Sequence, residues 1–154
     1  MHSRIFQVST NPINETDYID ECCYWDHWFI NEVADYVANS TDRDGDIEWL
    51  MEYSKGIIIS EDENGKFLIV TDKEKYFKNA FENFQEAINK VSKYTIDDFI
   101  QSSSYEIWKI KDSYENMFGF YIDCNDDLMS LDRFVRLSPI NKKYYIGGTV
   151  DYHF

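Results

Sequence analysis

The chain has 154 residues, of which 44% are apolar and 18% are aromatic, and this composition excludes a disordered chain. Because so much apolar surface can bury a core, we expect a single globular domain over residues 1–154. The net charge of −14 opposes direct binding to nucleic acid and to anionic membranes, since both are themselves negatively charged.

The first part of the chain predicts a strand and then an acidic region of mixed character. Residues 4–9 favour a short strand that ends in the turn-prone sequence TNPIN. In residues 17–39, apolar side chains recur every three or four positions, which predicts a helix that is clearest over residues 27–38. Residues 17–26 fit an acidic loop equally well, because their short polar side chains compete for backbone amide groups.

A second helix is predicted over residues 44–53. Acidic residues crowd its N-terminus, where the free amide groups and the helix dipole favour negative charge. We expect Ile47, Leu50 and Met51 to face the core, because they follow helical spacing.

The middle of the chain predicts a hairpin followed by helices. The apolar runs GIII and FLIV flank an Asn-Gly pair at residues 64–65, which suits a hairpin turn, and we expect this hairpin to be buried on both faces. Residues 72–94 carry an apolar stripe at helical spacing and predict a long amphipathic helix. Thr95 and Asp98 resemble a capping box that opens a short helix ending near Gln101.

The last third predicts a second hairpin and a further helix. The sequences YEIWKIK and MFGFYID are interpreted as its two strands, over residues 105–111 and 117–123. A helix is expected over residues 126–136, with Asn125 as its cap and the Ser-Pro pair at residues 138–139 as its end.

Residues 142–152 predict a closing strand or a tight hairpin, with Gly147 and Gly148 as a bulge or turn. Strands are thus expected mostly in hairpins and do not alternate with helices. This order predicts an α+β fold, in which a single domain has a mainly antiparallel sheet of hairpins packed against about four helices.

The stretch DECCYWDHWF, residues 20–29, contains the residue types of metal sites and of catalytic thiols. Structural zinc sites need cysteines two to four residues apart, whereas Cys22 and Cys23 are adjacent. The surrounding carboxylates are expected to raise the pKa of these thiols, which opposes their activation as nucleophiles. We therefore predict no catalytic residue, no metal ligand and no cofactor in this stretch.

Negative charge is concentrated in one third of the sequence. Residues 15–63 contain fifteen Asp and Glu against two basic residues, which gives this segment −13 of the total charge. Carboxylates accelerate the encounter with a cationic protein, and exposed tryptophans provide contact area. Immunity proteins and DNA mimics use the same physics.

From this asymmetry we predict a non-enzymatic, acidic protein-binding module. It would act as an inhibitor or decoy that engages a basic protein, either a nucleic-acid-binding protein or a toxin-like one. The predicted partner-binding residues are Asp17, Asp20, Glu21, Asp26, Asp35, Asp42, Asp44, Asp46, Trp25 and Trp28.

Three alternatives stay open at this point. The acidic third can be only a solvated face, the protein can be a small hydrolase or transferase with a carboxylate pair in a cleft, or it can be a structural, oligomeric subunit. In the last case exposed aromatic residues from 105–121 or 144–152 would form the interface. The sequence does not determine the oligomeric state.

The three cysteines and the short apolar runs bear on the compartment. An odd number of cysteines, two of them adjacent, does not predict a disulfide framework. No apolar run is long enough for a membrane span, and the N-terminus lacks the apolar region of a signal peptide. We therefore expect reduced thiols, a cytoplasmic location and no membrane partner.

Overall fold

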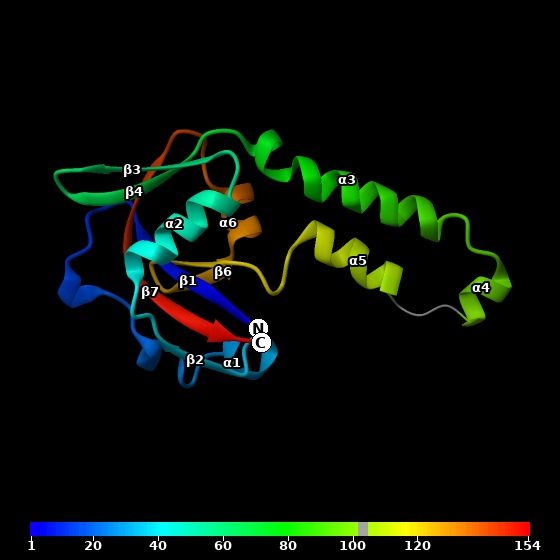
Figure 1. Cartoon of the computed structure of the whole chain (residues 1–154), viewed down its shortest axis with the longest axis horizontal. Helices are drawn as coiled ribbons and strands as arrows, with labels where there is room; N and C mark the ends of the chain where they lie inside the picture. Colours follow the sequence, from blue (N-terminus) through cyan, green and yellow to red (C-terminus); the bar gives the residue numbers. More distant parts are fainter. Residues whose placement is uncertain (102–104) are drawn as a thin grey trace.

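A sheet that includes both ends of the chain forms the body of the protein (Figure 1). The computed structural model describes residues 1–101 and 105–154. Within these residues the sheet has seven strands, namely β1 (His2–Ser9), β2 (Tyr36–Asn39), β3 (Ile57–Asp62), β4 (Gly65–Val70), β5 (Tyr121–Cys124), β6 (Asp127–Ser130) and β7 (Lys143–His153).

The helical segments of the same residues connect these strands. They are η1 (Glu15–Asp17), η2 (Glu21–Tyr24), α1 (Phe29–Glu32), α2 (Arg43–Tyr53), α3 (Lys73–Val91), α4 (Ile96–Gln101), α5 (Tyr105–Tyr114) and α6 (Leu131–Leu137). The sheet and these helices agree with the predicted α+β class in broad terms.

The long strand β7 organises the sheet. The strand order is β3-β4-β7-β1-β5-β6, and β2 pairs with β7 as well. On one side of β7, its first residues pair with β4 and its last residues pair with β2. On the other side, β1 pairs with β7 from Tyr145 to His153, with one bulge. The β1–β5 pair is parallel and the remaining pairs are antiparallel, so the sheet is mixed.

A bulge interrupts the β1–β7 pair, as the two glycines predict. Phe6 pairs with Thr149 and Val8 pairs with Ile146, so Gly147 and Gly148 lie opposite the single residue Gln7. Side chains of a strand alternate between the two faces of the sheet, and the extra residue shifts this alternation by one position. Even-numbered residues of β7 therefore face one side before the bulge and the other side after it. Tyr144 and Ile146 therefore belong to one core cluster, and Val150 and Tyr152 belong to the other.

Several predicted elements are confirmed. They are the first strand (β1), the helix over residues 44–53 (α2), the Asn-Gly hairpin (β3 and β4), the long helix (α3), the short helix after it (α4) and the closing strand (β7). The capping box that opens α4 forms as expected. The amide and the hydroxyl of Thr95 donate to Asp98 Oδ2 over 2.9 and 2.7 Å, and the amide of Asp98 donates back to Thr95 Oγ1 over 3.2 Å.

The helix predicted over residues 27–38 is wrong. Only Phe29–Glu32 forms a short helix, and within it Asn31 has a φ of 74°. The chain then enters β2, because the last residues of β7 offer unpaired backbone groups to residues 36–39. Tertiary hydrogen bonding outweighs the helical spacing, although Phe29 and Val33 are buried in either arrangement.

The predicted second hairpin is also wrong. Residues 105–114 form the helix α5, which lies beside α3. Of the second predicted strand only residues 121–123 are extended, as part of β5. The helix predicted from Asp126 starts instead at Leu131, capped by Ser130. Positive φ angles at Asn125 and Asp126 mark the turn between β5 and β6, since asparagine and aspartate tolerate this conformation.

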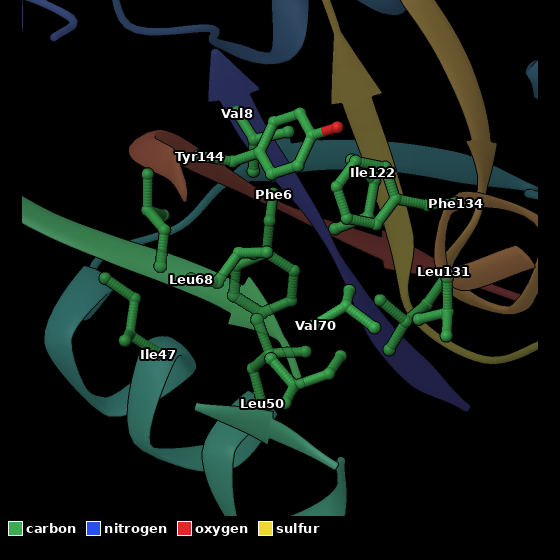
Figure 2. Close-up of a cluster of buried hydrophobic side chains, with 13 residues drawn as sticks. Phe6, Val8, Ile47, Leu50, Leu68, Val70, Ile122, Leu131, Phe134 and Tyr144 are labelled. Atoms are coloured by element: carbon green, nitrogen blue, oxygen red, sulfur yellow. The ribbon is translucent and has the colours of Figure 1, made fainter. Parts of the chain in front are cut away.

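Two hydrophobic clusters hold the body together. In the first, Phe6, Leu50 and Leu68 are fully buried between the sheet and the helices α2 and α6 (Figure 2). The second contains Ile5 and Tyr152 of the sheet, covered by residues of the segment between β1 and β2. Each fully buried side chain of this size stabilises the fold by about 1.5–3 kcal/mol.

Two predictions about the core are corrected by the exposure of side chains. Met51 was expected to face the core but is more than half exposed. Ile58, on the outer strand β3, is more than half exposed too, so the hairpin is not buried on both faces. An edge strand has fewer neighbours to cover it, which explains the second difference.

The helices α3, α4 and α5 project from the body as an arm (Figure 1). We use the term arm for residues 73–101 and 105–114. α3 and α5 lie side by side in opposite directions, and α4 lies at the far end. Among the described residues, no helix has both the length and the apolar character required to cross a membrane.

Candidate functional site

The acidic segment between β1 and β2 is anchored to the body by two buried aromatic residues, Tyr24 and Phe29. The Tyr24 hydroxyl donates a hydrogen bond of 2.7 Å to Oδ2 of the buried Asp123 in β5. Burial and this nearby carboxylate raise the pKa of Tyr24 far above its usual value, so the phenol remains a donor. The Phe29 ring packs edge-on against Tyr121 and Tyr152 at 4.7 and 5.0 Å between ring centroids.

Because Tyr24 and Phe29 point inward, the tryptophans beside them point outward. Trp25 is 65% exposed and Trp28 is 53% exposed. Between them, the Nδ1 of His27 accepts a 3.3 Å hydrogen bond from the amide of Phe29, and its ring lies 5.4 Å from the Trp28 ring. The two tryptophans are thus held on a fixed turn with most of their surface free.

Three acids of the segment between β1 and β2 are exposed and have no basic partner among the described residues. Asp17, Asp20 and Asp26 are exposed, and none of them forms an ion pair with a basic side chain in residues 1–101 and 105–154. Asp20 caps the turn η2 through the amide of Cys22 at 2.9 Å. Their charges therefore remain uncompensated by the protein itself.

Glu21 and Asp35 lie at the two ends of β2. Glu21 is half-buried, accepts a 3.1 Å hydrogen bond from the amide of Asn39, and donates its own amide to the Asn39 side chain. Asp35 is exposed and lies 3.2 Å from the ring of His153. Glu21 thereby fastens η2, the turn that precedes Trp25, to β2.

Asp126 joins this group from a distant part of the sequence. It is exposed in the β5–β6 turn, and its amide donates to Oδ1 of Asp123 over 3.1 Å. The other oxygen of this carboxylate accepts the Tyr24 hydroxyl, so Asp126 lies close to the anchored turn. No sequence signal indicated its role, because its position depends on how β5 pairs within the sheet. We define the acidic surface as Asp17, Asp20, Glu21, Asp26, Asp35 and Asp126 together with Trp25 and Trp28.

Asp42 and Asp44 lie at the start of α2. Asp42 caps the helix by accepting the amide of Gly45 over 3.0 Å. Asp44 accepts a 2.6 Å hydrogen bond from Lys66, and this ammonium lowers the pKa of Asp44. Both are exposed, but the charge of Asp44 is partly compensated, so their contribution to partner binding stays a prediction.

The expectation that Asp46 belongs to a binding surface is wrong. It is buried and accepts hydrogen bonds from Arg4 Nε at 2.5 Å, Ser40 Oγ at 2.5 Å and Thr149 Oγ1 at 2.8 Å. Arg4 also pairs with Asp151. Asp46 therefore joins α2 to the centre of the sheet, a structural role that its neighbours in the sequence do not share.

The side chain of Gln7 holds the acidic segment on the bulge of β7. Its amide group donates to the carbonyl of Asp17 at 2.9 Å and accepts from the amides of Ile19 at 3.2 Å and Gly148 at 2.9 Å. A Cβ on Gly148 would lie 2.8 Å from the carbonyl oxygen of Ile19. The glycines thus allow the segment to lie directly on the sheet.

The adjacent cysteines Cys22 and Cys23 lie in an acidic setting. Cys22 and Cys23 are exposed free thiols. Partial desolvation and the charges of Asp20 and Glu21 raise the pKa of Cys22, in the direction predicted from the sequence. In the described part of the chain, no three His, Cys, Asp or Glu side chains are arranged to hold a metal ion.

A pair of acids lies in a cavity of about 330 Å³ at the base of the arm, lined by Asp112 and Asp132. Burial and the charge of Asp132 raise the pKa of Asp112. Both oxygens of Asp132 are already engaged, one by the Tyr76 hydroxyl at 2.9 Å and one by the Asn116 amide at 2.8 Å. Asp132 therefore has a structural use, since it links α3 to the segment that follows α5.

In comparisons with known proteins, no protein-family model matches the chain, and neither does any curated protein or solved structure.

Proposed function

We propose that this protein is a non-enzymatic binding module that engages a basic protein through the acidic surface. The observation that carries the proposal is the exposure of both Trp25 and Trp28 in a segment whose acids Asp17, Asp20 and Asp26 pair with no basic side chain in residues 1–101 and 105–154. Exposed tryptophans supply the desolvated contacts that dominate binding energy, and surrounding charge supplies rate and orientation. If the acidic surface served only to keep the protein solvated, its charges would be sufficient, and two exposed indole rings would have no use.

The anchoring of the segment supports the same proposal. Tyr24 and Gln7 fix the turn from inside, so the surface is organised before a partner arrives. A preorganised surface loses less conformational entropy on binding than a mobile one. An inhibitor or decoy for a nucleic-acid-binding or toxin-like protein is the role that fits a rigid acidic surface. A cytoplasmic location belongs to this proposal, because the exposed thiols of Cys22 and Cys23 suit a reducing compartment.

The proposal is tested by affinity capture with variants of equal net charge. The test variant is Asp17→Asn/Asp20→Asn/Asp26→Asn, and the control is Glu74→Gln/Glu82→Gln/Asp97→Asn, which removes three exposed charges from the arm. We expect a basic protein to be captured by the wild type and the control at low salt, and to be released at high salt. The test variant and Trp25→Ala/Trp28→Ala are expected to lose it.

Equal capture by the test and control variants would show that only net charge matters. Capture that does not change with salt, or that needs neither tryptophan, would contradict the proposed surface. Catalytic turnover with any small substrate would favour the enzyme alternative.

A further inference from the structure

The hairpin of α3 and α5 has one polar face and one apolar face. On the polar face, Lys90 lies 3.0 Å from Glu86 on its own helix and 3.9 Å from Glu106 on α5. On the other face, Phe81 and Tyr114 line a hollow of about 260 Å³ between the two helices. The two faces therefore differ in chemistry along the length of the hairpin.

The apolar face continues towards the far end of the arm. Ile88 is two turns beyond Phe81 on α3, and Ile107 is two turns beyond Tyr114 on the antiparallel helix α5. These four side chains are 41–57% exposed, so the described residues leave a large part of each uncovered. Ala87, in contrast, is fully buried between the helices.

The apolar stripe of α3 is wider than a two-helix hairpin needs. Two packed helices bury a narrow seam, whereas helices of a bundle carry a third apolar position that faces another helix. In α3 the seam includes Phe84 and Ala87, and the third position is occupied by Phe81 and Ile88. The hairpin thus has the composition of half a four-helix bundle.

The short helix α4 adds a second apolar surface at the far end of the arm. Ile96, Phe99 and Ile100 share one face of this helix and are 70–72% exposed. Together with the four residues of the hairpin, they expose roughly 600–1,000 Å², if each large apolar residue has about 150–250 Å² in total. About 800 Å² per partner is the usual size of a stable protein interface.

The distribution of charge indicates that the missing partner is a second copy of this chain. Residues 73–114 contain seven lysines and seven acids, so the arm is neutral and the whole net charge of −14 lies outside it. Two copies would repel each other through almost any other surface. They can approach through the arm without that penalty.

The two ends of the arm are also complementary in charge. Three lysines and one glutamate, Lys73 to Lys78, give the first turns of α3 a charge of +2, whereas Asp97 and Asp98 give α4 a charge of −2. Two arms packed antiparallel about a two-fold axis would bring each α4 beside the first turns of its partner's α3. In such an isologous pairing the same contact between α4 and the start of α3 forms twice, once at each end of the bundle.

We propose that the protein forms a two-fold symmetric dimer in which two arms pack antiparallel into a four-helix bundle. The apolar faces of the two hairpins cover each other, and α4 of each copy covers the hollow at the base of the other arm. The acidic surface stays free in this arrangement, since it lies on the body. The dimer is therefore independent of the proposed function.

Sedimentation equilibrium of the full chain tests this dimer. The wild type is expected to reach twice the chain mass of 18.4 kDa as concentration rises. Phe81→Glu/Ile88→Glu is expected to weaken association more than about hundredfold, because two anchoring contacts are each replaced by a charge. Both sites are exposed, so circular dichroism should show an intact fold. Ile58→Glu, an exposed apolar residue outside the arm, is the matched control and should dimerise normally.

A charge exchange tests the antiparallel arrangement. Lys78→Glu and Asp97→Lys should each weaken association about threefold, as expected for exposed ion pairs, and the double variant should restore it. Trp25→Ala/Trp28→Ala should leave the dimer unchanged. A wild type that stays monomeric at its highest soluble concentration, or a dimer that survives Phe81→Glu/Ile88→Glu, overturns the proposal. Failure of the double variant to restore association overturns the antiparallel packing.

Discussion

The hydroxyl of Tyr24 lies 2.7 Å from Oδ2 of Asp123, and both residues are buried. They are 99 residues apart in the sequence, and their hydrogen bond fastens the acidic segment to the central sheet. Oδ1 of Asp123 accepts the amide of Asp126 over 3.1 Å. The carboxylate therefore joins the turn that carries Trp25 to the turn between β5 and β6.

Tyr24→Phe is expected to destabilise the protein by about 1–3 kcal/mol, because it leaves one oxygen of the buried Asp123 without a donor. The phenyl ring still fills the site, so the loss is due to the hydrogen bond alone. Urea unfolding measures the difference. Tyr53→Phe, at an exposed site, is the control and should change stability by less than about 0.5 kcal/mol. Equal stabilities for both variants would show that the buried bond contributes nothing.

Asp46→Ala is expected to cost about 3–5 kcal/mol, because it removes a buried carboxylate and leaves Arg4 without one of its partners. Asp44→Ala removes an exposed acid two residues away and is expected to leave the stability almost unchanged, because surface ion pairs contribute little. Denaturant unfolding of the two variants side by side distinguishes the structural acid from the surface acid. A cost for Asp44→Ala as large as that for Asp46→Ala would contradict the assignment.

Gly148→Ala is expected to destabilise the protein by about 1–3 kcal/mol, because the new Cβ would meet the backbone of Ile19 at 2.8 Å. The segment over the bulge must then move away from the sheet and lose its hydrogen bonds to Gln7. Amide hydrogen exchange should show faster exchange at Ile19 in this variant. Gly119→Ala, whose Cβ would meet only the Asn116 side chain at 3.1 Å, is the comparison.

Buried tyrosines should make the protein sensitive to alkali. Burial raises the pKa of Tyr121 to about 12, from 10.0 in the unfolded chain, and the charge of Glu115 adds to this shift. Above pH 10 the unfolded state therefore loses the phenolic proton first, so the folded state binds more protons and its stability falls as pH rises. The stabilisation is complete below pH 10 and declines between about pH 10 and 12.

Tyrosinate absorbance and unfolding free energy, followed together, measure this effect. Tyr121→Phe should reduce the slope of stability against pH in that range. A slope that is the same in the wild type and in Tyr121→Phe would contradict the buried tyrosine as its cause.

The fluorescence of Trp25 and Trp28 should be quenched more strongly by caesium ions than by iodide, because their surroundings are acidic and exposed. Added salt should reduce this difference. The double variant Trp25→Phe/Trp28→Phe should remove it, whereas Trp108→Phe, on the neutral arm, should not. Equal quenching by both ions in the wild type would contradict the proposed field at the acidic surface.

Local sequence signals correctly predicted the elements that depend mainly on residues close together in the sequence. The Asn-Gly turn of β3 and β4, the capping box of Thr95 and Asp98, and the stripe of α3 depend on contacts within a few positions of the chain. The adjacent glycines indicated the bulge of β7, and the concentration of acids in residues 15–63 indicated the candidate surface.

Only the tertiary structure decided the rest, because the competing arrangements differ in long-range contacts. Residues 36–39 form a strand since β7 offers them backbone partners, and residues 105–114 form a helix since α3 lies beside them. Burial of Tyr24 and Phe29 turns Trp25 and Trp28 outward, and the internal pairing with Arg4 removes Asp46 from the surface. The sequence by itself determined where the charge is concentrated, whereas packing determined which of those acids and aromatic rings remain accessible to a partner.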